Sequence, residues 1–196
     1  MAVMELRSRR MILREGQNPA DVENAIRALG GSADARVVRD FFGGRREVEW
    51  LIGADLKVVQ GEDGTSRCRY VQVFGNDEDD VMAAIESCEE SLRPWSYDDL
   101  IRFYDIAGGS KEGPHAVLRL ALGAPPSYDD DFYSRVLNSM GNSDPAIRDA
   151  GVLAAASYGL RAFVPRLSEL ARNDSDPEVR DTARATLEAY AEAGLT

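Results

Sequence analysis

The residue types that most often carry covalent chemistry are scarce in this chain of 196 residues. It has one histidine, His115, and two cysteines, Cys68 and Cys88. A cysteine beside a histidine can form a nucleophile and its base, but no local signature marks either possible dyad here. The cysteines form no CxxC pair, so they indicate neither a disulfide framework nor a zinc site. Glycine-rich phosphate loops, GxSxG elbows and HExxH motifs are also absent from the sequence, and we predict no catalytic residue and no cofactor.

Two acidic runs are the next candidates, because clustered carboxylates can hold a divalent cation. They cover residues 77–80 and 129–131. Neither run has the alternating ligands and central glycine of a calcium-binding loop. Each fits the first turn of a helix, where acidic side chains are stabilised by the helix dipole. We therefore predict no metal site and treat these acids as candidates for contact with a protein partner.

The elements that must position these residues begin at repeated phrases. SDPAIRDA and SDPEVRDT lie 32 residues apart. In each phrase an aspartate, Asp144 or Asp176, is predicted to cap a helix, and the proline after it occupies the first helical position. The same phrases carry two arginines at matching positions, Arg148 and Arg180.

A second repeated phrase lies upstream, where PWSYDD and PPSYDD are 31 residues apart. Here we predict Ser96 and Ser127 as the helix caps, with Asp99 and Asp130 completing capping boxes. The predicted helices cover residues 96–107, 114–122, 128–140, 145–158, 162–172 and 177–193.

Paired helices at a period near 32 residues are typical of an α-solenoid. The stretches DPAIRDAGVLAAASYG and DPEVRDTARATLEAYAEAG resemble HEAT repeats, particularly the short bacterial HEAT-like type associated with phycobilisome lyases. The resemblance covers about residues 96–193 and is best over 127–193. It implies three stacked helical hairpins, in which Arg148 and Arg180 contact carboxylates or carbonyls of their own or adjacent repeats. It also implies a scaffold or binding surface far more often than an enzyme.

Residues 1–95 differ in composition and are predicted to form an α+β region that caps the repeats. Two helix signals begin at Asn18 and Ser32, and each ends at a glycine pair. Residues 46–75 are rich in β-branched and aromatic residues, which predicts an antiparallel β-hairpin or three-stranded meander and the only sheet. Residues 76–92 then predict another helix.

A short basic arm precedes these elements and contains Arg7, Arg9, Arg10 and Arg14. Such an arm could contact RNA or a membrane, but short arms of this kind are usually solvated. We therefore predict a solvated arm.

The net charge of −11 limits the class of partner. Residues 51–140 carry −9 of it, whereas residues 1–50 carry +1. A nucleic-acid binder depends on Lys and Arg to neutralise phosphates, so this balance argues against nucleic acid as the main partner. No apolar run reaches the ~20 residues that cross a bilayer, and the N-terminal apolar cluster is too short for a secretory signal. We expect a cytoplasmic protein with no membrane contact.

The sequence as a whole predicts a mainly α-helical, non-catalytic protein–protein interaction module of bacterial type, an adaptor or scaffold for a partner with a basic surface. One concrete form is an immunity or antitoxin-like protein that masks a basic toxin. The alternative is a small enzyme of the chromophore-lyase type, which a cavity holding His115, a cysteine and acids together would favour. The SYDD starts should form one acidic ridge beside an exposed tyrosine. The predicted partner-binding residues are Asp77, Glu78, Asp79, Asp80, Tyr97, Asp98, Asp99, Tyr128, Asp129, Asp130 and Asp131.

Overall fold

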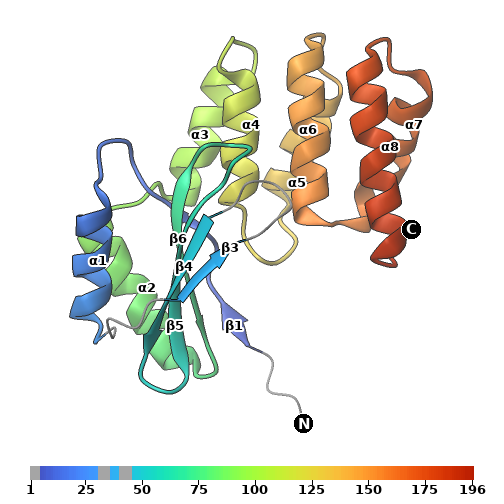
Figure 1. Ribbon diagram of the computed structural model, residues 1–196. Coiled ribbons are helices and arrows are strands. Elements are labelled where there is room, and N and C mark those ends of the chain that lie inside the picture. Colours follow the sequence, from blue (N-terminus) through green and yellow to red (C-terminus); the bar gives the residue numbers. More distant parts are fainter. Residues whose placement is uncertain (1–4, 31–35, 40–45) are drawn as a thin grey trace. The chain divides into compact units, whose positions relative to one another are not determined.

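The computed structural model describes residues 5–30, 36–39 and 46–196 (Figure 1). Within these residues the protein is mainly helical, with eight α-helices and one antiparallel sheet. The predicted class, mainly α with a small N-terminal sheet, is confirmed at this level.

The chain divides into two compact units. The first contains Met1–Ser96 together with Pro125–Ser127, and the second contains Tyr97–Ala124 together with Tyr128–Thr196. All the described strands belong to the first unit, and residues 97–124 and 128–196 contain helices only.

The first unit is built on an antiparallel sheet. Its strands are β1 (Leu6–Arg7), β2 (Met11–Ile12), β3 (Arg36–Arg39), β4 (Arg46–Ile52), β5 (Leu56–Glu62) and β6 (Arg69–Gly75). Their order across the sheet is β1-β6-β5-β4-β3, and β2 also pairs with β6. Strands β4, β5 and β6 form the predicted meander, in which Val58 stands opposite Trp50 on one side and Val73 on the other.

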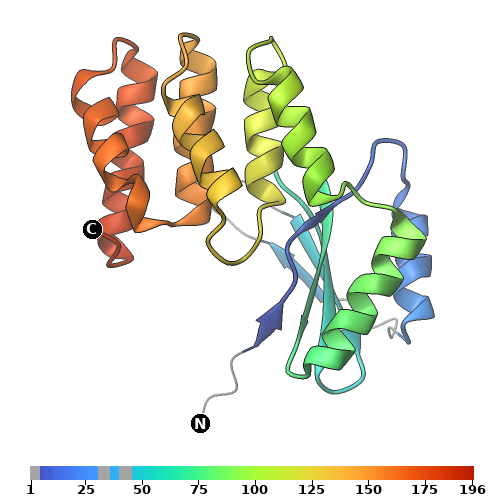
Figure 2. The ribbon, with the colours of Figure 1, turned by 180° about the vertical axis from the view of Figure 1, so that it is seen from behind.

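Two helices cover one face of this sheet, α1 (Pro19–Ala28) and α2 (Glu78–Leu92), and they lie beside each other (Figures 1 and 2). Asn18 begins α1 with a capping box, and Asp77 caps α2 by accepting from the backbone N–H of Asp80. The core between helices and sheet is apolar, which provides the main stabilisation of the unit. It includes Val22, Ala25, Ile26, Trp50, Val58, Val71, Val73, Val81, Ala84, Cys88 and Leu92.

The predicted extent of the sheet and the second predicted helix are both wrong. Residues 36–39 form strand β3, in which Val37 pairs with Val48, instead of the helix expected after Ser32. Paired Val residues favour a strand when a neighbouring strand is available, because β-branched side chains fit a pleated surface. The proposed start at Ser32 lies outside the described residues.

The basic arm is also not a free, solvated arm. Strands β1 and β2 pair with β6, so the arm is part of the sheet. Arg9 is mostly buried and donates from a guanidinium nitrogen to the backbone oxygen of Trp95 at 3.0 Å. Burial lowers the pKa of Arg9 from its ordinary value.

The second unit consists of α-helices and one short 3₁₀ turn. The helices are α3 (Tyr97–Ala107), α4 (Gly113–Leu122), α5 (Asp130–Met140), α6 (Pro145–Tyr158), α7 (Val164–Asn173) and α8 (Pro177–Glu192), with the 3₁₀ turn η1 at Arg161–Phe163. The six predicted helices are therefore confirmed, with ends that differ by one or two residues.

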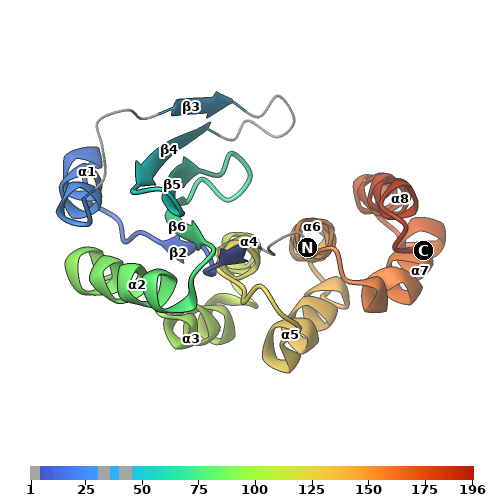
Figure 3. The ribbon, with the colours of Figure 1, turned by 90° about the horizontal axis from the view of Figure 1, so that it is seen from below.

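These helices pack in pairs along the chain. Helix α4 packs on α3 and on α6, and α6 packs on α5 and on α8, which also packs on α7. Viewed along the helices, α4, α6 and α8 follow one another in a row, with α3, α5 and α7 on one side of it (Figure 3). Phe132, Ile147, Phe163 and Leu167 are fully buried among them.

Aspartates cap three of the helices in the second unit. Asp144 and Asp176 accept hydrogen bonds from the first free backbone N–H groups of α6 and α8. Asp129, however, caps α5 in the place predicted for Ser127, and its carboxylate accepts from the N–H of Phe132 at 2.7 Å. The capping box predicted at the start of α5 is wrong for the same reason, because Asp130 is already the first helical residue.

The two repeated arginines bind the turns before their own helices. Arg148 donates to the carbonyls of Asn142 and Ser143 and forms a two-point ion pair with Asp174. Arg180 donates to the carbonyls of Asp174 and Ser175.

Candidate protein-binding surface

The first turns of α3 and α5 are joined by a hydrogen bond between residues 32 positions apart. The hydroxyl of Tyr97 donates to Oδ1 of Asp129 at 2.5 Å. The same carboxylate oxygen caps α5. Asp129 therefore connects the start of α5 with the ring of Tyr97 at the start of α3.

A second set of contacts joins the same two helices farther along. The guanidinium of Arg135 on α5 donates to both carboxylate oxygens of Asp105 on α3, each at 2.9 Å. Arg135 also pairs with Asp131 one turn earlier at 2.8 Å. The hydroxyl of Tyr104 donates to the backbone oxygen of Arg135 at 2.8 Å. Helices α3 and α5 therefore present their starts to solvent as one connected surface.

We call this surface the α3–α5 edge. Its residues are Tyr97, Asp98, Asp99, Arg102, Asp105, Tyr128, Asp129, Asp130, Asp131 and Arg135. The six carboxylates outnumber the two guanidinium groups, which gives the edge a formal charge of −4. A surface of this sign attracts cationic partners and repels polyanions.

The polar groups of the edge bind one another and shift each other's pKa values. Burial, the hydrogen bond to Asp129 and nearby carboxylates raise the pKa of the Tyr97 phenol. The hydrogen bonds from Arg135 hold the pKa of Asp105 below its usual range, and Asp105 in turn raises the pKa of Arg135. The ion pair of Asp105 with Arg135 is therefore charged at neutral pH, whereas the Tyr97 phenol is neutral.

Two large side chains are exposed to solvent, one just before α5 and one on α3. The side chain of Tyr128 is 54% exposed, and its hydroxyl donates to Oδ1 of Asp130 at 2.8 Å. Ile106, in the last turn of α3, is 84% exposed. Exposed aromatic and aliphatic groups beside charged groups are the usual anchors of protein interfaces.

The structure therefore brings together the predicted residues of the SYDD starts, which are Tyr97, Asp98, Asp99, Tyr128, Asp129, Asp130 and Asp131. The other predicted acids, Asp77, Glu78, Asp79 and Asp80, begin α2 in the first unit. Sequence reasoning missed Asp105, Ile106 and Arg135. The repeat offset could have revealed the pair of Asp105 with Arg135, because the two residues lie 30 positions apart, close to the repeat period.

The residues considered for catalysis have other contacts. Nε2 of His115 lies 2.8 Å from a guanidinium nitrogen of Arg119, one turn later on α4. Cys68 and Cys88 are both buried, and burial together with Glu89 raises the pKa of Cys88 to about 11. The Cys88 thiol is therefore protonated at neutral pH and is a weak nucleophile. Neither of the two cavities described in the units is lined by His115 or by a cysteine.

The described residues contain neither a cluster of metal-ligating side chains nor a helix that could span a membrane. Among them, no three or more His, Cys, Asp or Glu side chains are grouped as metal ligands. In the same residues, every helix is too short or too polar to span a bilayer.

The fold and the surface define a class of protein, a mainly helical chain with a small antiparallel sheet and an acidic edge on its helical unit. Comparisons with protein-family models, curated proteins and solved structures give no match for this chain.

Proposed function

We propose that the protein is a non-catalytic protein–protein interaction module whose α3–α5 edge binds a partner with a basic surface. In this proposal the second unit is a short α-solenoid of three HEAT-like hairpins. The repeated Asp-Pro starts, the packing of α4 on α6 and of α6 on α8, and the arginine contacts at equivalent turns support that description.

The observation that carries the proposal is the hydrogen bond between Tyr97 and Asp129. It links the starts of two consecutive hairpins, so that carboxylates from both lie on one surface beside the exposed ring of Tyr128. A fixed acidic surface accelerates the encounter with a cationic protein, and a neighbouring aromatic side chain supplies contact area after the encounter.

The partner is a protein with clustered Lys or Arg residues on its surface. One such partner would be a basic toxin such as a nuclease, which this chain would mask in an immunity or antitoxin-like role. Binding of this kind takes place without chemistry, so the protein contributes shape and charge alone. We place the interaction in the cytoplasm, in agreement with the low cysteine content of the chain.

The test compares wild-type protein with two charge-reversed variants as bait in a pull-down from the native host, with mass spectrometry. The first variant, Asp98→Lys with Asp130→Lys, changes exposed carboxylates of the edge and leaves the cap at Asp129 intact. The second, Glu188→Lys with Glu192→Lys, makes the same change in charge on α8. Both variants are first checked for unaltered helicity and urea unfolding.

We expect one or more basic proteins to be retained by the wild type and by the α8 variant but lost with the edge variant. With the isolated partner, the edge variant should associate about tenfold more slowly at low salt and show a weaker salt dependence. If both variants retain the same proteins at the same rates, the edge is only a solvated face and the proposal fails.

A further inference from the structure

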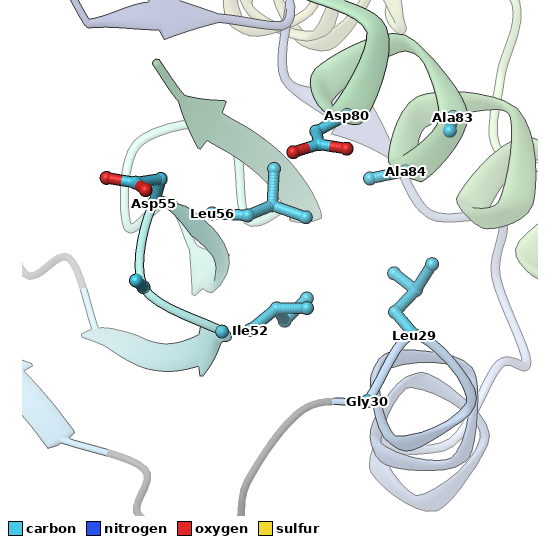
Figure 4. A pocket seen from close by; sticks show the side chains of 10 residues that line it. Leu29, Gly30, Ile52, Asp55, Leu56, Asp80, Ala83 and Ala84 are labelled. Atoms are coloured by element: carbon cyan, nitrogen blue, oxygen red, sulfur yellow. The ribbon is translucent and has the colours of Figure 1, made fainter. Parts of the chain in front are cut away.

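A cavity in the first unit offers space but no specific binding chemistry. It measures about 520 Å³ and opens between the end of α1, the turn between β4 and β5, and the first turns of α2 (Figure 4). Leu29, Ile52 and Leu56 line it, and the carboxylate of Asp55 points away from the space between them (Figure 4). Asp80 is left as one exposed carboxylate, which selects no class of ligand. The charged side of α8, in the second unit, has a more specific pattern.

Helices α6 and α8 hold equivalent places in the row of Figure 3, and both bury the side that packs on the preceding helices. Ile147 of α6 and Val179 of α8, at matching positions, are 2% and 1% exposed. On α6 the opposite side is buried as well, and Val152 and Ala155 there are fully buried. The carbonyl of Ala155 accepts from the hydroxyl of Tyr190 at 2.6 Å, so α8 covers this side of α6.

The corresponding side of α8 is uncovered, and its residues differ accordingly. Arg184 stands 32 positions after Val152 and is exposed, and Leu187 stands 32 positions after Ala155 and is half-buried. A charged residue at a position that is apolar and buried in the preceding pair makes this side of α8 a surface and not a core. What can cover this surface is therefore decided by its charges.

Four charged residues follow one another at every fourth position along this side of α8. They are Arg180, Arg184, Glu188 and Glu192, and we call them the α8 stripe. Side chains four residues apart on a helix are neighbours, so the four charges form a continuous line. The first half of the stripe is positive and the second half is negative.

The charges of the α8 stripe do not pair with one another. Arg184 pairs with Asp181 one turn earlier and not with Glu188. Among the residues that the structure describes, Arg180 donates to backbone carbonyls only, and neither Glu188 nor Glu192 has an ion pair. The stripe is therefore open to charges from another surface.

A second copy of the same helix has the matching charges when it runs in the opposite direction. With a two-fold axis near the middle of the stripe, Arg180 of each copy lies opposite Glu192 of the other. Arg184 then lies opposite Glu188, and the two Leu187 side chains meet near the axis. Each type of ion pair forms twice, because a two-fold interface uses the same patch on both copies. We propose that the protein forms an antiparallel, two-fold symmetric dimer through α8.

The length of α8 limits the strength of this dimer. Its 16 residues span about 24 Å. One pair of such helices buries less than the roughly 1,600 Å² of a standard protein interface, so we expect a Kd of roughly 10–100 µM. The interface uses none of the residues of the α3–α5 edge. The variant Glu188→Lys with Glu192→Lys loses the dimer but keeps that edge, so the two proposals fail separately.

Sedimentation equilibrium of the full chain, from about 5 to about 500 µM, measures the dimer over a range that spans this Kd. We expect a monomer–dimer equilibrium with no larger species, because two-fold pairing closes at the dimer. High salt should shift the equilibrium toward the monomer, since exposed ion pairs are screened.

Charge reversal and its compensation test the pairing itself. Arg184→Glu and Glu188→Arg each place like charges opposite one another, and each should raise the Kd about tenfold or more. The double variant, Arg184→Glu with Glu188→Arg, restores opposite charges and should return the Kd close to the wild-type value. Lys111→Glu makes the same change in charge as Arg184→Glu in the turn before α4, and it should leave the Kd unchanged. Helicity and urea unfolding are checked for each variant first.

A chain that stays monomeric over the whole concentration range would overturn the proposal. Species larger than a dimer, an equal loss of dimer in Lys111→Glu, or no recovery in the double variant would overturn it as well. If Arg184→Glu alone unfolds, Glu188→Arg and the double variant still decide the outcome, because recovery of the dimer requires both reversals.

Discussion

Arg148 and Asp174 form a buried two-point ion pair between the start of α6 and the turn that follows α7. Nε and a terminal nitrogen of Arg148 donate to the two carboxylate oxygens of Asp174 at 2.8 and 2.7 Å. The side chains are only 11% and 4% exposed. The remaining terminal nitrogen donates to the carbonyls of Asn142 and Ser143. This arginine therefore fixes two interhelical turns of the second unit at once.

Loss of the Asp174 charge should strongly destabilise the second unit. Asp174→Asn leaves the Arg148 guanidinium buried without its counter-charge, and breaking a buried pair from one side costs about 3 kcal/mol. Urea unfolding at pH 7, followed by far-UV circular dichroism, measures this loss. Arg180→Met is the matched comparison, because Arg180 donates to the carbonyls of Asp174 and Ser175 and is less buried than Arg148. We expect this variant to lose clearly less unfolding free energy. Equal effects would show that the ion pair adds nothing beyond packing.

The same pair makes the stability depend on acid pH. The hydrogen bonds from Arg148 hold the pKa of Asp174 below its ordinary value. The stabilisation by the Asp174 carboxylate is therefore complete above the pKa of about 4 that an aspartate has in the unfolded chain. It is lost as the pH falls through the lower pKa of Asp174 in the folded protein. The difference in unfolding free energy between wild type and Asp174→Asn should be large at pH 7 and should shrink below pH 4. A difference that stays constant from pH 7 to pH 3 would contradict this assignment.

The helical unit could be predicted from sequence because its signals are local. An aspartate before a proline caps a helix wherever it occurs, and Asp144 and Asp176 do so here. The start of α5 was misassigned because three successive acids and a serine offered several possible caps, and only the hydrogen bond to Phe132 distinguishes Asp129. Strand β3 was missed because its pairing with β4 is a tertiary contact that overrides local helix propensity.

The candidate site was predictable in part for the same reason. The SYDD phrases marked Tyr97, Asp98 and Asp130 as residues of equivalent helix starts, and a repeat period implies that such starts are neighbours. Exposure of Ile106 follows from packing between segments far apart in sequence.

Alkaline pH should reveal the hydrogen bond between Tyr97 and Asp129. The raised pKa of Tyr97 means that the folded protein keeps this phenol neutral at pH values where an unfolded tyrosine, with a pKa near 10, ionises. Stability from Tyr97 is therefore complete below about pH 10 and is lost as the pH rises toward the folded pKa. Tyr97→Phe should cost about 1 kcal/mol at pH 8, and the gap to wild type should narrow by pH 11.

Tyr128→Phe is the control for this experiment, because its ring is largely exposed and its hydrogen bond to Asp130 lies in solvent. We expect it to change the unfolding free energy little at pH 8. The assignment of Tyr97 is wrong if the two phenylalanine variants behave alike at both pH values.

The native thiols should react slowly with Ellman's reagent. Burial, with a smaller contribution from Glu89, raises the pKa of Cys88 to about 11, so the thiolate fraction at pH 8 is very small. In a Cys68→Ser variant, which isolates Cys88, we expect almost no absorbance change at pH 8 until urea is added, and then one equivalent of released thiolate. Rapid reaction of the folded variant at pH 8 would show that Cys88 is accessible and would reopen a nucleophilic role.

Strand β5 should not tolerate a side chain at Gly61. Gly61 stands opposite Tyr70 in the sheet register, and a Cβ added there would lie 2.4 Å from the Tyr70 ring. The ring cannot move away easily, because Tyr70 is fully buried and its hydroxyl donates to Glu47 at 2.5 Å. Gly61→Ala should therefore lower the free energy of unfolding by about 1–3 kcal/mol through overpacking. This loss exceeds the small stabilisation that alanine gives by reducing the conformational entropy of the unfolded chain.

Gly109→Ala separates this clash from the general effect of replacing glycine. A Cβ at Gly109 meets no atom within 4 Å. Gly109→Ala reduces the conformational entropy of the unfolded chain without creating a clash in the folded state. Its urea midpoint should therefore equal or slightly exceed that of wild type. Near-UV circular dichroism adds a readout of the tyrosine environment, which should change in Gly61→Ala alone. If both alanine variants unfold at the wild-type midpoint, Tyr70 is free to adjust, and the close contact between β5 and β6 is not a constraint on the sheet.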